Sequence, residues 1–120
     1  MLLLDTNAIL RYILQDNLEM ADIVEEQLSN NQCYIPIEVV AEIVYVLLKV
    51  YKVERKIIFQ TLEDIADTKN ISVAKDAVVR HALNVFASSS FDFVDCLLIG
   101  YAKEEQYSVF TFDKKLQKHL

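Results

Sequence analysis

Short apolar segments that alternate with amphipathic helical segments are the feature that most constrains this fold. Leu2–Leu4 is a continuous apolar run typical of a strand buried on both faces, and Asp5-Thr6-Asn7 then begins a helical pattern. Further short strands are expected at 33–35, 71–73 and 107–111. Strands separated by helices run parallel, with helices covering the sheet. The sequence therefore predicts an α/β protein with helices on both faces of a parallel sheet.

The intervening segments carry apolar residues at helical spacing and begin at residues suited to helix starts. The helices are expected from Asp5 onward, from Asn17 to about Leu28, from Pro36 to Tyr51, from Glu54 to Ala66, from Asp76 to Ala87 and from Asp92 to Glu105. No repeat or linker interrupts the 120 residues, which contain one Gly and one Pro. We therefore expect residues 1–120 to form one domain.

Charge and cysteine content bound the class of protein. Twelve Lys and Arg face 18 Asp and Glu, and this net charge of -6 argues against a protein that covers duplex DNA phosphates with basic side chains. Cys33 and Cys96 are expected to be small buried hydrophobes, not parts of a disulfide framework. The first residues lack a signal peptide pattern, and the apolar stretch 39–51 is too short to span a bilayer. These features predict a soluble cytoplasmic protein.

Acidic residues stand at chemically suggestive places in this pattern. Asp5 and Asp113 each follow a predicted strand, where the sites of parallel sheets lie. Asp95 stands where a predicted helix enters the core, three residues after Asp92. Glu42 interrupts a helix that is otherwise almost wholly apolar. Together these acids offer several hard oxygen ligands, which suit Mg²⁺ or Mn²⁺. Zinc is disfavoured because no Cys or His stands at ligand spacing.

Each acid also has an ordinary structural explanation. Asp5, Asp92 and Asp113 fit the role of helix N-caps, and Glu42 fits a narrow solvent-exposed stripe on its helix. An unpaired buried carboxylate at Glu42 would instead need a cation, a partner or an open cleft. Both interpretations of Glu42 stay open on the sequence alone.

Four short motifs in order resemble the PIN-domain ribonucleases, and within them the VapC-like toxins of toxin–antitoxin pairs. The motifs are Leu4-Asp5-Thr6-Asn7, Ile35-Pro36 leading to Ala41-Glu42-Ile43, Asp92-Phe93-Val94-Asp95-Cys96, and Phe110-Thr111-Phe112-Asp113. The resemblance implies a three-layer α/β/α sandwich with a short parallel sheet of about four strands. It also implies a Mg²⁺- or Mn²⁺-dependent endoribonuclease.

The resemblance assigns a role to each matching residue. Asp5, Glu42 and Asp95 match the acidic triad that holds the metal, and Asp113 matches a fourth, more variable acid. Asp92 matches the preceding acid of the same motif, which is often a neighbour of the metal ligands, and it is an additional candidate ligand here. Thr6, Asn7 and Thr111 match supporting polar positions. Separately, Arg11 is an RNA-contact candidate because it lies on the helix that begins at Asp5.

The resemblance further implies an RNA substrate, a cognate antitoxin that occludes the site, and a homodimer. A phosphate-receiving signalling domain is the first alternative, since it is also small, acidic, α/β and Mg²⁺-dependent. That fold requires adjacent acids after the first strand and a Lys after the last one, and neither stands there. A catalytically silent PIN-fold interaction module is the second alternative.

Overall fold

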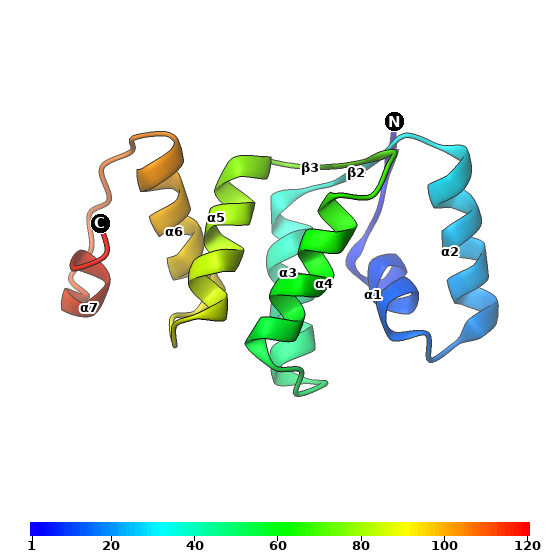
Figure 1. Ribbon diagram of the computed structural model, residues 1–120, viewed down its shortest axis with the longest axis horizontal. Coiled ribbons are helices and arrows are strands. Elements are labelled where there is room, and N and C mark those ends of the chain that lie inside the picture. Colours follow the sequence, from blue (N-terminus) through cyan, green and yellow to red (C-terminus); the bar gives the residue numbers. More distant parts are fainter.

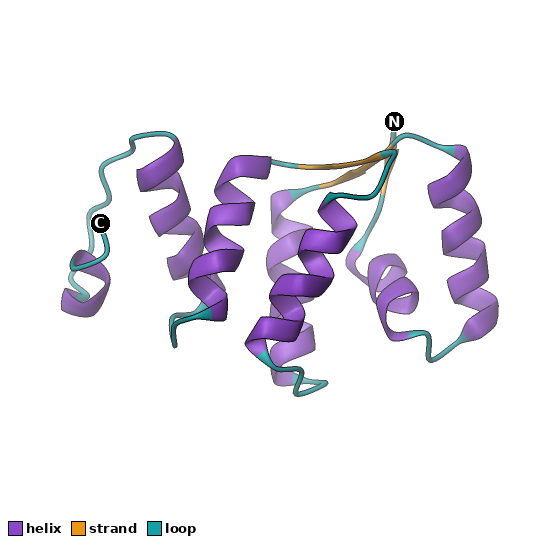
Figure 2. Cartoon of the chain, in the orientation of Figure 1, coloured by secondary structure: helices purple, strands orange, loops and turns teal.

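The computed structural model describes all 120 residues, which form three short strands and seven helices (Figure 2). In chain order the elements are β1 (Leu2–Leu3), α1 (Thr6–Leu14), α2 (Leu18–Asn30), β2 (Cys33–Ile35), α3 (Ile37–Lys49), α4 (Arg55–Ala66), β3 (Ile71–Val73), α5 (Asp76–Ala87), α6 (Phe93–Glu104) and α7 (Lys114–Gln117). The expected helices are all present, and their bounds differ from the predictions by a few residues.

The strands form one parallel sheet in the order β1-β2-β3. Leu2 pairs with Cys33 and Tyr34 pairs with Ser72. Figure 1 shows the strands along one side of the molecule, with helices α1 to α6 arranged beside them along its long axis. The predicted α/β class is confirmed.

The prediction of a strand at 107–111 is wrong in this structure. The segment has no strand partner and lies between α6 and α7. Figure 1 places it at the α6–α7 end of the molecule, with α3 to α6 between it and the N-terminal strand. The segment has strand composition, but the chain does not bring a free sheet edge to it.

Side-chain caps fix the start of three helices. Asp5 Oδ1 accepts a hydrogen bond from the Ala8 amide at 2.8 Å, and Asn17 Oδ1 accepts one from Met20 at 3.1 Å. Asp113 Oδ1 accepts from Leu116 at 3.0 Å and so begins α7. The predicted capping roles of Asp5 and Asp113 are therefore confirmed.

The core is one continuous cluster of 25 buried apolar residues. Cys33 and Cys96 are both free and 0% exposed, which confirms that they act as small core residues. Burial raises the pKa of the Cys96 thiol to about 11. Every helix is too short or too polar to cross a membrane.

Five residues other than glycine adopt left-handed backbone conformations at the ends of helices and strands. They are Gln15, Lys52, Asn70, Lys75 and Gln106, with φ between 50° and 72°. The single glycine, Gly100, lies inside α6 and serves packing instead.

Helix α6 lies very close to α5 because residue 100 has no side chain. A Cβ atom added to Gly100 would lie 2.6 Å from the Val78 carbonyl oxygen and 3.2 Å from its Cγ1. Backbone atoms cannot move aside cheaply, so only glycine fits this contact.

We therefore expect Gly100→Ala to destabilise the protein by about 1–3 kcal/mol through overpacking. Alanine is otherwise about 1 kcal/mol better than glycine inside a helix, so a loss here reports the contact with Val78. Urea unfolding followed by circular dichroism measures the change, with the exposed substitution Lys103→Ala as the control. Equal or greater stability of the Gly100→Ala variant would contradict the close contact.

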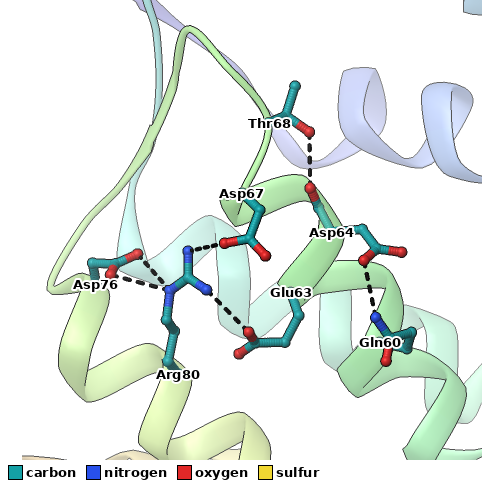
Figure 3. Close-up of polar contacts among 7 residues, drawn as sticks. All are labelled: Gln60, Glu63, Asp64, Asp67, Thr68, Asp76 and Arg80. Atoms are coloured by element: carbon teal, nitrogen blue, oxygen red, sulfur yellow. Dashed lines mark hydrogen bonds and ion pairs between the residues drawn. The ribbon is translucent and has the colours of Figure 1, made fainter.

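Arg80 of α5 pairs with three carboxylates, two of which stand at the end of α4 and so hold α4 against α5 (Figure 3). Its guanidinium pairs with Glu63 at 3.0 Å, Asp67 at 2.8 Å and Asp76 at 3.1 Å. Glu63 and Asp67 stand at the C-terminal end of α4, where the helix dipole disfavours negative charge. Arg80 offsets that repulsion and neutralises a dense group of acids.

We expect Arg80→Gln to lower the free energy of unfolding by about 1 kcal/mol, since the three carboxylates lose their shared cation. The difference from wild type should narrow in 1 M NaCl (about 3 Å Debye length), because salt screens the repulsion left behind. Urea unfolding at low and high salt measures both effects, with Lys69→Gln as the exposed control. A salt-independent loss would show that the packing of the Arg80 side chain is what matters.

Candidate active site

Asp5 lies on the surface at the junction of β1 and α1. Its carboxylate is exposed and caps α1. Asp5, Asn7 and Arg11 line one shallow pocket of about 350 Å³, whereas Thr6 is half-buried. The structure thus brings two of the predicted polar residues and the RNA-contact candidate to one place.

The Arg11 side chain turns toward its own chain. Nη1 donates to Asp16 Oδ2 at 2.9 Å, and the neighbouring Tyr51 and Asp16 raise the pKa of Arg11. Its Nε–H is buried without a partner. Arg11 is therefore available to a ligand only through part of its guanidinium.

Glu42 lies on the exposed face of α3. Glu38, Glu42, Tyr45 and Lys49 follow one another at helical spacing and are all exposed. The structure favours the solvent-stripe interpretation of Glu42, and a buried carboxylate at this position is not observed. The buried residues of α3 are instead Val40, Ile43, Val44 and Leu47.

Asp95 is the partly buried carboxylate that has no partner. Only Glu63, Asp95 and Glu105 among the acids are partly buried, and Glu63 and Glu105 form ion pairs with Arg80 and Lys75. Asp95 forms neither a salt bridge nor a side-chain hydrogen bond. Burial, with added repulsion from Asp92 and Asp113, raises its pKa.

Asp92 occupies the N-cap position of α6, but its side chain accepts no capping hydrogen bond. The prediction that this carboxylate caps the helix is therefore wrong, although the position is correct. The Asp92 carboxylate stays exposed and close enough to Asp95 to repel it.

Asp92 and Asp95 stand at the rim of a groove between α3 and the start of α6. The groove has a volume of about 570 Å³, and most of its lining is apolar. Its lining residues are Ala41, Val44, Tyr45, Leu48, Lys49, Phe86, Asp92, Phe93, Val94 and Asp95. An apolar groove with two carboxylates at one side can receive an extended or helical ligand.

Asp113 and Thr111 approach this cluster from the C-terminal part of the chain. Thr111 Oγ1 accepts a hydrogen bond from the Asp113 amide at 3.0 Å, so Thr111 supports the turn at Asp113. The Asp113 carboxylate caps α7 and contributes to the repulsion at Asp95. The structure therefore gathers Asp92, Asp95 and Asp113 in one acidic neighbourhood.

The acids do not converge on a single point. Nowhere do three or more carboxylates, histidines or cysteines come together closely enough to hold one metal ion. The donor chemistry suits Mg²⁺ or Mn²⁺, since every acid offers hard oxygen ligands. The structure therefore does not bring Asp5, Glu42 and Asp95 together as one metal-binding group.

Arg55 positions the start of α6, a role that the sequence did not indicate. Its Nη1 donates to the Phe91 carbonyl at 2.7 Å and to the Phe86 carbonyl at 3.3 Å. The guanidinium also stacks over the Phe86 ring at 4.2 Å. In the sequence, the bases at 49–56 suggest a solvated helix face. Only the contacts with the loop before α6 show that Arg55 has a different role from the neighbouring lysines.

The sequence matches the PIN domain over residues 2–119. It is 29% identical over 123 residues to the VapC ribonuclease of Aquifex aeolicus (strain VF5), a comparison that covers 98% of this chain and 91% of the relative. No solved structure is significantly similar to the chain. Since the family match spans nearly every residue, from the strand before Asp5 to the end of α7, the chain belongs to the PIN domain family.

Proposed function

We propose that the protein is a metal-dependent endoribonuclease that hydrolyses RNA phosphodiester bonds, and that it acts in the cytoplasm as the toxin of a toxin–antitoxin pair. The family and the similarity to a VapC ribonuclease support the class of activity. The placement of the acids in this chain supports the chemistry.

The observation that carries the proposal is the unpartnered Asp95 carboxylate. Transfer of a carboxylate from water is unfavourable unless a cation or hydrogen bonds compensate. The other two partly buried acids have such a cation, and Asp95 instead faces two further carboxylates. A divalent cation beside Asp95 would compensate the burial and the repulsion together.

Asp95, Asp92 and Asp113 are the residues that this neighbourhood offers to a cation, and Asp5 and Glu42 are those that the family motifs add. A bound divalent cation lowers the pKa of water and stabilises the leaving oxygen of a phosphodiester. Thr111 orders the backbone at Asp113, and Thr6 and Asn7 flank Asp5. Arg55 holds the loop that precedes Asp92 and so fixes the acidic end of α6.

The groove between α3 and α6 suits the antitoxin partner better than it suits RNA. Its lining is mainly apolar, whereas an RNA backbone requires basic side chains, of which it offers only Lys49. A partner helix seated there would cover the Asp92–Asp95 turn and block the site. Occlusion of this kind would silence the nuclease without a conformational change.

Among the alternatives, a phosphate-receiving domain lacks support from the structure. Such a domain needs adjacent acids after the first strand, and β1 is followed by the single acid Asp5. The Lys75 that follows β3 pairs with Glu105. A silent interaction module is separated from a nuclease by the assay below.

RNA cleavage assays with Mn²⁺ or Mg²⁺ test the proposed activity. We expect wild-type protein to cleave structured RNA, and chelation by EDTA to abolish cleavage. Asp5→Asn, Glu42→Gln and Asp95→Asn should each lower the rate by about a hundredfold or more, because even changes outside the ligand set cost 10–100-fold. The rate of product formation on a gel measures each effect.

Glu26→Gln serves as the matched control, because Glu26 is an exposed helical glutamate on α2 outside the motifs. It should cleave RNA at the wild-type rate. Equal cleavage by wild type and the three site variants would identify a contaminating nuclease. Absence of cleavage by wild type, with antitoxin binding retained, would favour the silent module.

A second experiment measures directly how much the unpartnered Asp95 carboxylate lowers the stability of the fold. In EDTA at neutral pH, we expect Asp95→Asn to be more stable than wild type, because the raised pKa means that folding disfavours the charged form. The advantage should shrink as the pH falls through that raised pKa and vanish below about pH 3.9, the ordinary value for Asp. Thermal unfolding across this range measures the difference, and a variant less stable than wild type at pH 7 would refute it.

A further inference from the structure

Residues 107–112, here called the arm, form an extended segment of strand-like composition with no strand partner. The backbone amides of 108–112 donate no hydrogen bond within the chain. Phe110 and Phe112 are each 87% exposed and pack edge-to-face against one another, with ring centroids 5.3 Å apart. An uncharged, aromatic segment with free amides is a template for pairing with another strand.

Both ends of the arm are held at one end of the molecule. The Tyr107 ring packs edge-on against Tyr101 of α6 at 5.8 Å. On the other side, Leu116 of α7 is 2% exposed, and His119 packs against Phe91 at 5.0 Å. The Lys115 ammonium also donates to Ser90 Oγ at 2.8 Å. These contacts fix the arm at the α6–α7 end of the chain.

Strand β1 leaves a complementary edge open, and helices α3 to α6 lie between it and the arm of the same chain (Figure 1). Strand β1 is the outer strand of the sheet, and the amides of Leu2 and Leu4 donate toward β2. Because strand groups alternate, the Leu3 N–H and C=O face the open edge. Leu3 is 65% exposed, and Leu2–Leu4 contains no charge that would repel a second strand.

We propose that two copies of this chain exchange arms, so that the arm of each pairs in parallel with β1 of the other. The arm of one copy is anchored far from its own β1, along the 47 Å axis of the molecule (Figure 1). A second copy related to the first by a twofold axis supplies the missing edge to both chains. Reciprocal pairing also closes the assembly, which a single head-to-tail contact does not.

Arm exchange would also assemble the acids that one chain leaves apart. In a parallel pair the carboxyl ends of both strands meet at the same edge, so Asp113 after the arm of one copy would lie near Asp5 after β1 of the other. This consequence rests on the proposed function. The strand exchange itself does not, and its first test uses no RNA.

Cross-linking of single-cysteine partners tests the exchange. We would mix Leu3→Cys protein with Phe110→Cys protein, refold the mixture and add a short bismaleimide. We expect a product of twice the 13.8 kDa chain mass in the mixture and none in either variant alone. The unsubstituted chain is the background control because Cys33 and Cys96 are 0% exposed.

The double variant Leu3→Cys/Phe110→Cys separates the two ways of pairing the arm. Exchange predicts the doubled mass here too, whereas an internal cross-link at single-chain mass would overturn the proposal. A mixture without any cross-linked product would also overturn it. A ladder of higher masses would refute the reciprocal arrangement.

Light scattering on the uncross-linked proteins gives an independent readout. Wild type should show twice the chain mass, and Phe110→Pro should show the single mass with unchanged helical circular dichroism, because proline removes an amide from the ladder. A Phe110→Pro variant that keeps the doubled mass overturns the exchange. Phe110→Asp, expected to dissociate in the same way, replaces it if the proline variant does not fold.

Complementation then connects the exchange to the site. A refolded mixture of Asp5→Asn and Asp113→Asn chains contains mixed pairs with one intact combination of Asp5 and Asp113, so it should recover about a quarter of the wild-type cleavage, since half the pairs are mixed and each has one of two sites intact. An inactive mixture that still cross-links would overturn the shared site and leave the exchange standing. An inactive wild type would refute the proposed nuclease and leave the cross-linking result unaffected.

Discussion

The contact between α5 and α6 at Gly100 is the constraint on which the candidate site depends. Strands of two or three residues contribute little pairing, so helix packing determines where the acidic residues lie. The close contact of Gly100 with the Val78 carbonyl fixes α6 against α5, and the start of this same helix carries Asp95 and borders the groove beside α3. Arg55 then fixes the preceding loop from the other side.

Much of the fold could be predicted from the sequence, because its helices are amphipathic and begin at recognisable residues. The caps at Asp5, Asn17 and Asp113 are local features and appear as expected. The strand at 107–111 could not be excluded by the same reasoning. Strand formation requires a partner edge, and local composition does not report whether the chain delivers one.

The candidate site was only partly predictable for a similar reason. Helical spacing correctly placed Asp95 at the entrance to the core, but it left two interpretations of Glu42 that only the packing of α3 could separate. The three acids around Arg80 looked no different in sequence from those near Asp95. Glu63 and Asp67 differ from Asp95 in receiving a cation from a neighbouring helix, a long-range contact with no local signal.

The left-handed residues described above have a consequence for how the acids can come together. The chain turns at Lys75 and Gln106 without glycine, so these turns have few alternative conformations and make poor hinges. A swing of α6 and α7 across the molecule would require such a hinge. Assembly of the separated acids is therefore easier between rigid copies than within one flexible copy, and its extent would then depend on protein concentration.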